Sequence, residues 1–468
     1  MPTNQEIAQM AHLMRRAGFG ATYAELEERA ANGYEATVEE LLNPMTQPDL
    51  EMDVLERYFV DWKEMNALEV NQAYLTYRMI NTKRPLQEKM ALFWHGILCT
   101  GNSKCEHGRQ IQLQLDMFRE LGMGSFDGVL KGLSRDPAMV FYLDNCMSHK
   151  GAINENWGRE LLELFSMGVG MDGEANYSED DIKEAARAFT GWTITNAIPR
   201  YPYGRYESAF IYNPYDHDNE EKTFLGETGN LNGDDIVAII CRQQSAARFV
   251  SRHLYNFFVA DEVQVPAWQN TPPRDPEAIA LLEQTYFDSG YNLTAMLRVM
   301  FNSDFFKNAT FEKVKSPTEV VIGTMRLVQD FTTPKLGLQP LANTIRYMGQ
   351  DLMNPPTVEG WHTGAEWIDS GTLVERINFA ADQVGNTALP GIRDIVSRLD
   401  SEKITSPDAI VDRCLELVGA YELAPETRDQ LIAYTSSNGS VTPGTAEYSE
   451  AIAQTLQLIV STQEYKFA

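Results

Sequence analysis

The chain has 468 residues, enough to bury a large hydrophobic core in one big helical domain or in two or three ordinary domains. Its 43% hydrophobic and 22% charged residues are typical of a folded protein and exclude an intrinsically disordered chain. With 39 basic against 66 acidic residues, the formal net charge is −27, which repels phosphate backbones and anionic lipid. The composition therefore argues against nucleic acid as a partner.

Three further features bear on location. The longest apolar runs, such as "MALFWHGIL", are about half of the roughly twenty residues that a spanning helix needs, so we expect no membrane insertion. The start, "MPTNQEIAQMAHLMRRAGFG", lacks the charged region, apolar run and cleavage site of a secretory signal. The five cysteines are scattered and odd in number, which favours reduced thiols over a disulfide framework. Together these features predict a cytoplasmic location.

Helix starts recur along the chain. Thr followed three residues later by Glu predicts capping boxes in "TYAE" (22–25) and "TVEE" (37–40). Pro85 fits the first turn of a helix. Ser178 with Asp181 predicts another start, in a helix whose Ala185 and Ala186 allow close approach to a neighbour. A capping residue followed by proline predicts three more starts, at Asp136, Asp275 and Ser316.

A long segment, residues 193–223, interrupts this helical pattern and is rich in aromatic residues, Pro and Gly. Its composition excludes a helix, but "ESAFIYN" (207–213) can pair as a strand in a short hairpin. Loops of this length are often functional. The sequence as a whole predicts a mostly α protein: a single large multi-helix globular domain over 1–468, with a soft boundary near 308–316 before a C-terminal helical subdomain.

The segment "NENWGRELLELFSMG" (154–168) predicts an amphipathic helix whose apolar arc contains Trp157, Leu161, Leu162, Leu164 and Phe165. The opposite arc gathers five polar groups without a lysine. These are Glu155, Asn156, Arg159, Glu160 and Glu163. One interpretation is a solvated face with weak intrahelical ion pairs, and the other is a functional site.

Two histidines are candidates for chemistry. His95 lies in "ALFWHGIL", which is apolar on every side, so its ring is expected to be buried and to need a partner. With Cys99, Cys105 and His107 it forms a Cys and His mixture, but the spacing is not that of a standard zinc motif. In "YDHDNEEK", His217 stands beside Asp218 in the aromatic loop, where the pair is able to bind a metal or move a proton, or belongs to a solvated turn.

Several blocks together resemble a known family. They are, in order, "LMRRAGFG", "RPLQEKMALFWH", "DPAMVFYLDN", "NENWGRELLELFSMGVG", "YSEDDIKEAARAFTGW", "HD" followed by "KTFLG", "ARFVSRHLYNFFV" and "MGQDLMNPPTVEGW". This order of blocks resembles the bacterial family numbered 1800 among domains of unknown function, over roughly residues 10–380. The resemblance implies that the polar arc of 154–168, His95 and the 217–218 pair belong to the family pattern. It also implies a neighbour, since members are often found beside a sulfatase-like, exported family numbered 1501.

Two functional hypotheses follow. The first is an enzyme whose catalytic residues are Glu160, Arg159, His95 and Glu163, built around a divalent metal such as Zn, Fe or Mn. Its substrate-binding residues are Asn154, Asn156 and Trp192, with Arg159 placed to hold an anionic group of the substrate. Its metal ligands are His95, Glu160, Glu163, His217 and Asp218. The second hypothesis is a non-catalytic helical scaffold, an assembly partner of a family-1501 protein, in which the polar arc is a buried network.

The enzyme hypothesis carries two structural expectations. Glu160 and Arg159 should be mostly buried, so that the helix faces inward on both sides. His95 and the 217–218 pair should converge on that helix from separate parts of the chain.

Overall fold

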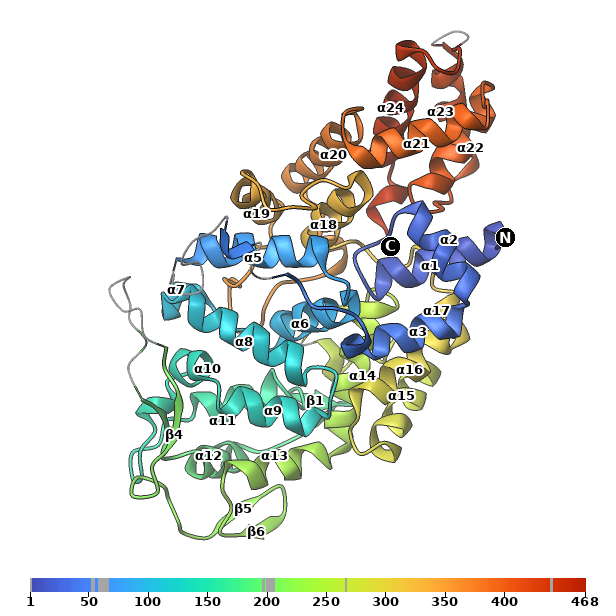
Figure 1. The fold of residues 1–468 in the computed structure, drawn as a ribbon. Coiled ribbons are helices and arrows are strands. Elements are labelled where there is room, and N and C mark those ends of the chain that lie inside the picture. The colour runs from blue at the N-terminus through green and yellow to red at the C-terminus, as the bar shows by residue number, and fades with distance from the viewer. Residues whose placement is uncertain are drawn as a thin grey trace.

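Figure 1 shows the computed structural model of the chain, which describes residues 2–51, 55–57, 67–195, 198, 207–265, 267–437 and 441–468. The structure is 61% helical, which confirms the predicted mostly α class. None of the described helices is both long and apolar enough to cross a membrane. The five cysteines are free thiols, as predicted.

The helices follow one another in three groups along the chain. The first group holds α1 (Asn4–Arg16), α2 (Tyr23–Asn32), α3 (Tyr34–Leu42) and the short η1 (Pro44–Thr46). The second holds α5 (Leu68–Asn81), α6 (Pro85–Ile97), α7 (Asn102–Cys105), α8 (Gly108–Leu121), α9 (Phe126–Ser134), α10 (Pro137–Tyr142), η3 (Asn145–Met147), α11 (Asn156–Glu163), α12 (Glu179–Ala188), α13 (Gly233–Cys241), α14 (Gln244–Phe258), η4 (Ala267–Gln269), α15 (Pro276–Asp288), α16 (Leu293–Asn302) and α17 (Asp304–Lys307). The third holds α18 (Pro317–Val328), α19 (Leu338–Tyr347), η5 (Gly364–Trp367), α20 (Ser370–Val384), α21 (Pro390–Ser401), α22 (Pro407–Leu417), α23 (Pro425–Ser437), α24 (Ala446–Ser461) and η6 (Glu464–Lys466).

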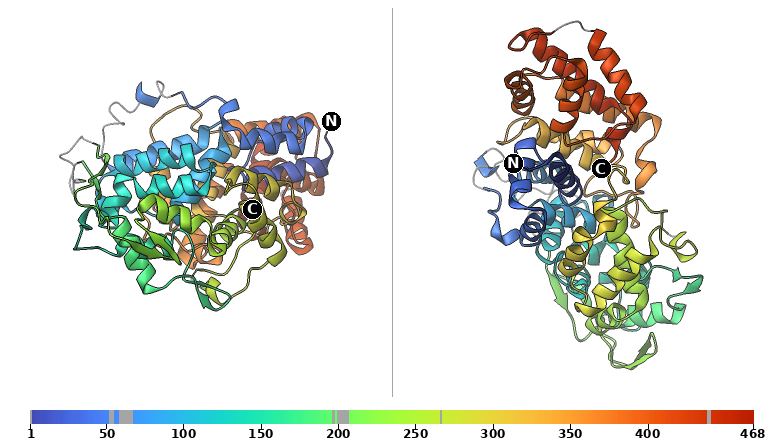
Figure 2. Two further views of the ribbon diagram at one scale, coloured as in Figure 1. Left: turned by 90° about the horizontal axis from the view of Figure 1, so that it is seen from below. Right: turned by 90° about the vertical axis from the view of Figure 1, so that its right-hand side faces the viewer.

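Helices α20–α24 form one end of the molecule, as the right-hand view of Figure 2 shows. Helix α18 connects this end to the rest, because it packs against both α5 and α20. One cluster of buried apolar side chains continues from Ile7 to Tyr465 and crosses the segment 308–316. The soft boundary at that segment stays a prediction.

Strands in the described residues occur as three antiparallel pairs. These are β1 (Gly170–Met171) with β2 (Glu174–Ala175), β3 (Trp192–Ile194) with β4 (Phe210–Tyr212), and β5 (Lys222–Phe224) with β6 (Glu227–Gly229). The β3–β4 pair, with Thr193 opposite Ile211, is the hairpin predicted for the aromatic loop. The rest of that prediction, at residues 196–197 and 199–206, lies outside the described residues.

The predicted helix starts are confirmed with one exception. Asp136, Asp275 and Ser316 each cap a helix that begins with proline, and Ser178 forms a capping box with Asp181. The start predicted at "TVEE" is wrong, because α3 begins at Tyr34 and Thr37 lies inside it, where its hydroxyl donates to the carbonyl of Gly33. Gly33 adopts φ +102°, which lets the chain turn directly from α2 into α3, one turn earlier than the Thr–Glu spacing indicates.

Helix α11 packs closely on α12 because both present small residues at the crossing. A Cβ atom added at Gly158 would lie 2.9 Å from the carbonyl oxygen of Ile182 and 3.1 Å from the amide of Ala186. Both are backbone atoms, so they cannot move aside without shifting the helix. The position of α11 therefore depends on this glycine.

Substituting Gly158→Ala is expected to lower the free energy of unfolding by about 1–3 kcal/mol, because overpacking outweighs the gain in helix propensity. The matched control is Gly96→Ala on α6, where an added Cβ meets nothing within 4 Å. That substitution is expected to stabilise the protein by up to about 1 kcal/mol. Urea unfolding of both variants measures the difference, and equal effects at the two positions would contradict the proposed close contact.

Candidate functional site

The apolar side of α11 is buried as predicted, with Trp157, Leu161 and Leu162 at most 2% exposed. Arg159 behaves differently. Its guanidinium donates two hydrogen bonds, of 3.1 and 2.9 Å, to the carboxylate of Glu179, and its side chain stays 36% exposed. Arg159 is partly buried, so the expectation that it is mostly buried is met only in part. The reason is that Glu179, the first residue of α12, holds the guanidinium near the surface.

Glu160 is half-buried, so the expectation that it is mostly buried is met only in part. No described group forms a hydrogen bond or an ion pair with its carboxylate. Burial and the nearby carboxylates of Glu163 and Glu359 raise the pKa of Glu160. Tyr177 lies close by. Its hydroxyl is buried without a hydrogen-bond partner, and burial together with the charge of Glu163 raises its pKa. This side of α11 therefore holds a carboxylate whose pKa is raised, although the charge of Arg159 opposes the shift.

The three residues predicted to bind substrate lie at the start of α11 and in the β3–β4 hairpin, and their role in binding stays a prediction. The Oδ1 atom of Asn154 accepts a hydrogen bond of 3.0 Å from the amide of Asn156, at the start of α11. Asn156 itself is exposed. Trp192 is 4% exposed and packs under the guanidinium of Arg135 at 4.7 Å. Their described contacts thus support the start of α11 and the β3–β4 hairpin.

His95 is fully buried in α6. Its Nε2 atom accepts a hydrogen bond of 2.9 Å from the amide of Met353, its ring packs edge-on against Trp361, and its Nδ1 atom has no partner. Burial lowers the pKa of His95 to about 4, so the imidazole is neutral at pH 7. Among the described contacts, none joins His95 to Glu160 or Glu163.

The neighbouring thiols and His107 form hydrogen bonds to three different backbone groups, and no described bond joins them to one another. Cys99 donates to the carbonyl of His95, Cys105 donates to that of Ala138, and the Nδ1 atom of His107 accepts from an amide at the start of α8. The Cys and His residues of this segment therefore each stabilise a different part of the local backbone.

The 217–218 pair belongs to α12 and the hairpin. The Nδ1 atom of His217 donates to the carbonyl of Thr190 at 2.9 Å, and Asp218 forms a 2.8 Å ion pair with Arg187. The described residues contain no group of three or more His, Cys, Asp or Glu side chains that could hold a metal ion. The structure therefore does not bring His95, Glu160, Glu163, His217 and Asp218 together as a ligand set.

Beside α11 lies a cavity of about 120 Å³, here called the aromatic pocket. It is bordered by α6, α14, the start of α18 and the segment 359–367. Leu164, one turn beyond Glu160, and Glu359, whose charge acts on Glu160, both line it, so Glu160 lies near the border of the pocket without lining it. Its aromatic walls are Phe93, Phe249, Phe257, Trp268, Trp361 and Trp367.

The aromatic pocket also contains polar atoms. The ring of His253 lies between Phe249 and Trp268, at centroid distances of 4.3 and 4.6 Å, and its Nε2 atom is buried without a partner. Burial and the adjacent charge of Arg252 lower the pKa of His253 to about 3, so this imidazole is neutral at pH 7. A neutral imidazole offers one donor or one acceptor to a bound molecule.

The inner end of the aromatic pocket meets a group of buried charges that we call the buried ion cluster: Arg16, Lys89, Asp261, Lys313 and Glu319. Lys89 is fully buried and donates to the carboxylate of Glu319 and, at 2.8 Å, to the carbonyl of Gly18. Lys313 donates to Asp261 at 2.8 Å. Arg16 is 1% exposed and donates to the carbonyls that end α14. The cluster joins α1, α6, α14 and α18.

The sequence analysis did not identify these residues as a site. Arg16 and Lys89 lie in two of the family-like blocks, and Glu319 follows the helix start predicted at Ser316. The available signal was a lysine inside "QEKMALFWH", a helix that is otherwise apolar toward its end, since a buried lysine requires a carboxylate partner. The sequence could not show which carboxylate this is, because Glu319 lies 230 residues away.

Glu319→Gln is expected to lower the free energy of unfolding at pH 7 by about 3–5 kcal/mol, because it leaves Lys89 buried without its counter-ion. The charge of Lys89 lowers the pKa of Glu319 to about 2 despite the burial of the carboxylate. The stability that this carboxylate contributes is therefore present above about pH 4.5 and is lost as the pH falls toward 2.

Chemical unfolding across pH 2–7 measures both effects, and the variant should lose less stability than the parent over that range. Glu179→Gln, which removes the exposed partner of Arg159, is the control and should change stability little. A Glu319→Gln variant as stable as the parent would contradict the importance of the cluster.

Comparison with known proteins adds a family but no function. A family model described as Protein of unknown function (DUF1800) matches residues 12–467. No curated protein and no solved structure gave a match.

Proposed function

This chain belongs to the family described as Protein of unknown function (DUF1800), and on that premise we propose that it is an enzyme acting on a small organic molecule held in the aromatic pocket. The observation that carries the proposal is the position of a half-buried, unpaired carboxylate, Glu160, near the border of an aromatic-walled cavity. In this proposal the pocket binds the substrate and Glu160 exchanges a proton with it.

The cavity has the character of a ligand site. Pockets that bind small molecules are concave and mostly apolar, with a few convergent polar groups. The volume of about 120 Å³ is close to that of a cavity that holds a benzene ring, about 150 Å³. The unpartnered Nε2 atom of His253 supplies a polar contact deep in the pocket. The substrate class is thus a molecule with a ring-containing body and at least one hydrogen-bonding group.

Glu160 is suited to proton transfer because no described hydrogen bond or ion pair stabilises its ionised carboxylate. A general base works best when its pKa lies near the operating pH, and burial beside two other carboxylates moves the pKa of Glu160 in that direction. Arg159 is already neutralised by Glu179, so Glu160 is not needed for that role. In this form of the proposal Arg159 positions α11 against α12.

The scaffold hypothesis, with a family-1501 protein as partner, required a buried polar network on α11. Arg159 is too exposed for such a network, and Glu160 has no described bond that would fix a register. The scaffold remains the alternative hypothesis, and it would be favoured if no small molecule bound in the aromatic pocket.

Indole, a small ring compound with one donor, is expected to bind the aromatic pocket, with saturation-transfer NMR as the measurement. Gly96 lines the pocket and has open space beyond its Cα atom, so Gly96→Phe should fill the cavity and weaken indole binding at least tenfold, which corresponds to about 1.4 kcal/mol of binding free energy. Gly96→Ala is the matched control and should bind indole nearly as the parent does. Equal binding by all three proteins would place indole elsewhere.

Glu160→Gln should keep a melting temperature equal to or above that of the parent, because it removes repulsion from Glu163 and Glu359 and breaks no described bond. Its turnover should fall at least a hundredfold, the usual contribution of a general base. The assay incubates parent and variant with a small-molecule extract and follows the loss of compounds by mass spectrometry. Glu179→Gln is the control.

A large drop in melting temperature, or the same compounds consumed by both proteins, would defeat the role of Glu160. Elemental analysis of the same samples for Zn, Fe and Mn shows whether the protein holds a divalent metal. A metal that is present in the parent and in Glu179→Gln but missing from Glu160→Gln would identify Glu160 as a ligand.

A further inference from the structure

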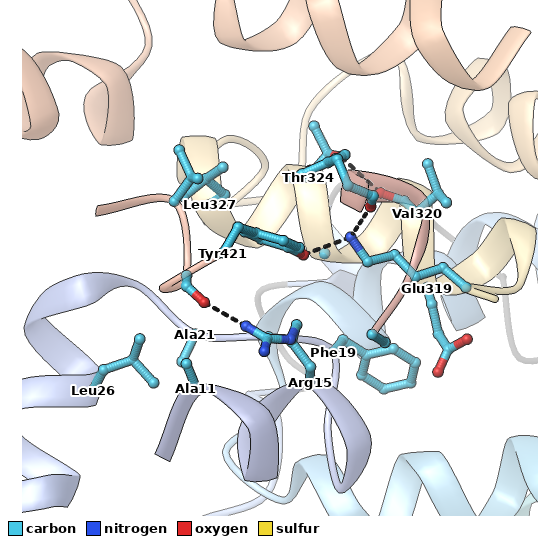
Figure 3. A pocket seen from close by; sticks show the side chains of 17 residues that line it. Ala11, Arg15, Phe19, Ala21, Leu26, Glu319, Val320, Thr324, Leu327 and Tyr421 are labelled. Atoms are coloured by element: carbon cyan, nitrogen blue, oxygen red, sulfur yellow. Dashed lines mark hydrogen bonds between the residues drawn. The ribbon is translucent and has the colours of Figure 1, made fainter. Parts of the chain in front are cut away.

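A second cavity, of about 50 Å³, lies on the other side of Glu319 from the aromatic pocket. We call it the basic pocket. It is enclosed by α1, α18 and two C-terminal segments, 418–421 and 465–468. Figure 3 shows its interior, with the guanidinium of Arg15 below the ring of Tyr421 and with Glu319 at the far side. Residues from the two ends of the sequence thus face each other in it.

Arg15 is the first buried cation of the basic pocket. It is 8% exposed, and its guanidinium lies 4.9 Å from the ring centroids of both Phe311 and Tyr421. One Nη atom donates to the carbonyl of Gly419, whereas the Nε atom is buried with no partner. The two rings pack against each other, with centroids 5.4 Å apart, on one side of the guanidinium, and the unpartnered Nε–H remains as a donor for a ligand.

Lys315 is the second buried cation. It is 7% exposed, and its Nζ atom bonds to the hydroxyl of Tyr421 and the carbonyl of Tyr465, both at 2.6 Å. Neither partner carries a negative charge. An ammonium group has three N–H donors, so one remains for a ligand. Burial, with the neighbouring charge of Arg15, lowers the pKa of Lys315 well below its usual value.

Among the described side chains that line the basic pocket, that of Glu319 is the only acidic one, and it forms no ion pair with Arg15 or Lys315. The groups that face Lys315 are Arg15 from α1, Glu319 from α18, Arg376 from α20, and the two tyrosines. Glu319 is bound by Lys89 and by the amide of Ser316. Arg376 is itself buried, with unpartnered Nε and Nη2 atoms, and donates to the carbonyl of Lys315. A protein of net charge −27 thus buries several cations around one engaged carboxylate.

Buried charges are stable when they are paired and hydrogen-bonded, and this pair has room beside it instead of a carboxylate. We propose that the basic pocket binds a small oxyanion, the carboxylate or phosphate group of a ligand, between Arg15 and Lys315. The anion accepts from the free edge of Arg15 and from the third N–H of Lys315. Because binding favours the ammonium form of Lys315, it is accompanied by uptake of a proton.

The test measures the melting temperature of the full chain in sulfate, phosphate, formate and acetate, with chloride at the same ionic strength as reference. A saturable rise above chloride is expected. Sulfate and phosphate acting alone would identify a tetrahedral anion, and formate or acetate acting alone would identify a carboxylate. No rise with any oxyanion above chloride would overturn the proposal.

Lys315→Met distinguishes a site from general salt stabilisation. This variant replaces a buried, unpaired cation by an apolar chain of similar length, so its melting temperature in chloride should equal or exceed that of the parent, while the oxyanion-dependent rise should disappear. Lys335→Met, at an exposed lysine, is the control and should keep the rise. An undiminished rise in Lys315→Met would overturn the proposal, because the anion would then bind elsewhere.

The proton uptake gives a readout that a structural role of Lys315 would not produce. Calorimetric titration with sulfate, in two buffers of different ionisation enthalpy, should show proton uptake on binding that grows as the pH rises, because a larger share of the free amine is then neutral. As the pH rises, the affinity for sulfate should fall, by up to about tenfold per pH unit where the amine of the free protein is neutral and that of the complex is charged. Sulfate affinity that is independent of pH, with no buffer effect, would contradict the part assigned to Lys315.

Discussion

The ion pair between Lys89 and Glu319 is the contact on which the arrangement of the centre depends. It joins α6 to α18 across 230 residues of sequence, and the same ammonium group also bonds to the carbonyl of Gly18 just after α1. Both side chains are almost completely buried, so removing either one would leave an unpaired charge in the interior. Buried pairs of this kind do little for stability compared with apolar packing, but they specify which helices meet.

The position of Glu319 explains why two pockets lie so close together. Glu319 lines both the aromatic pocket and the basic pocket, and its carboxylate is engaged by Lys89 and Ser316 in between. Lys313 lines the aromatic pocket and Lys315 lines the basic pocket, and the charge of each acts on or near the carboxylate of Glu319. A ligand in either pocket would therefore contact a wall that the other pocket shares.

The polar residues of α11 fall into two groups with different surroundings. Gly158 sets the distance to α12, and Arg159 with Glu179 closes the outer side of that contact. Glu160 and Glu163 point along the remaining side, toward Tyr177 and the segment that contains Glu359. The arginine thus stabilises a helix pair, whereas the glutamates are left without described partners. Unpaired, half-buried carboxylates are the residues that a structure would not keep for stability alone.

The sequence by itself determined the helical class, most helix starts and the apolar side of α11, because capping residues, prolines and a 3.6-residue period act over only a few neighbours. It also indicated that His95 is buried and that Glu160 belongs to a distinctive segment. Only the tertiary structure decided which polar groups meet. Arg159 turns outward because of α12, His95 accepts a hydrogen bond from the amide of Met353, and Lys89 pairs with Glu319 far along the chain. These pairings depend on helix packing between distant segments, which no local pattern encodes.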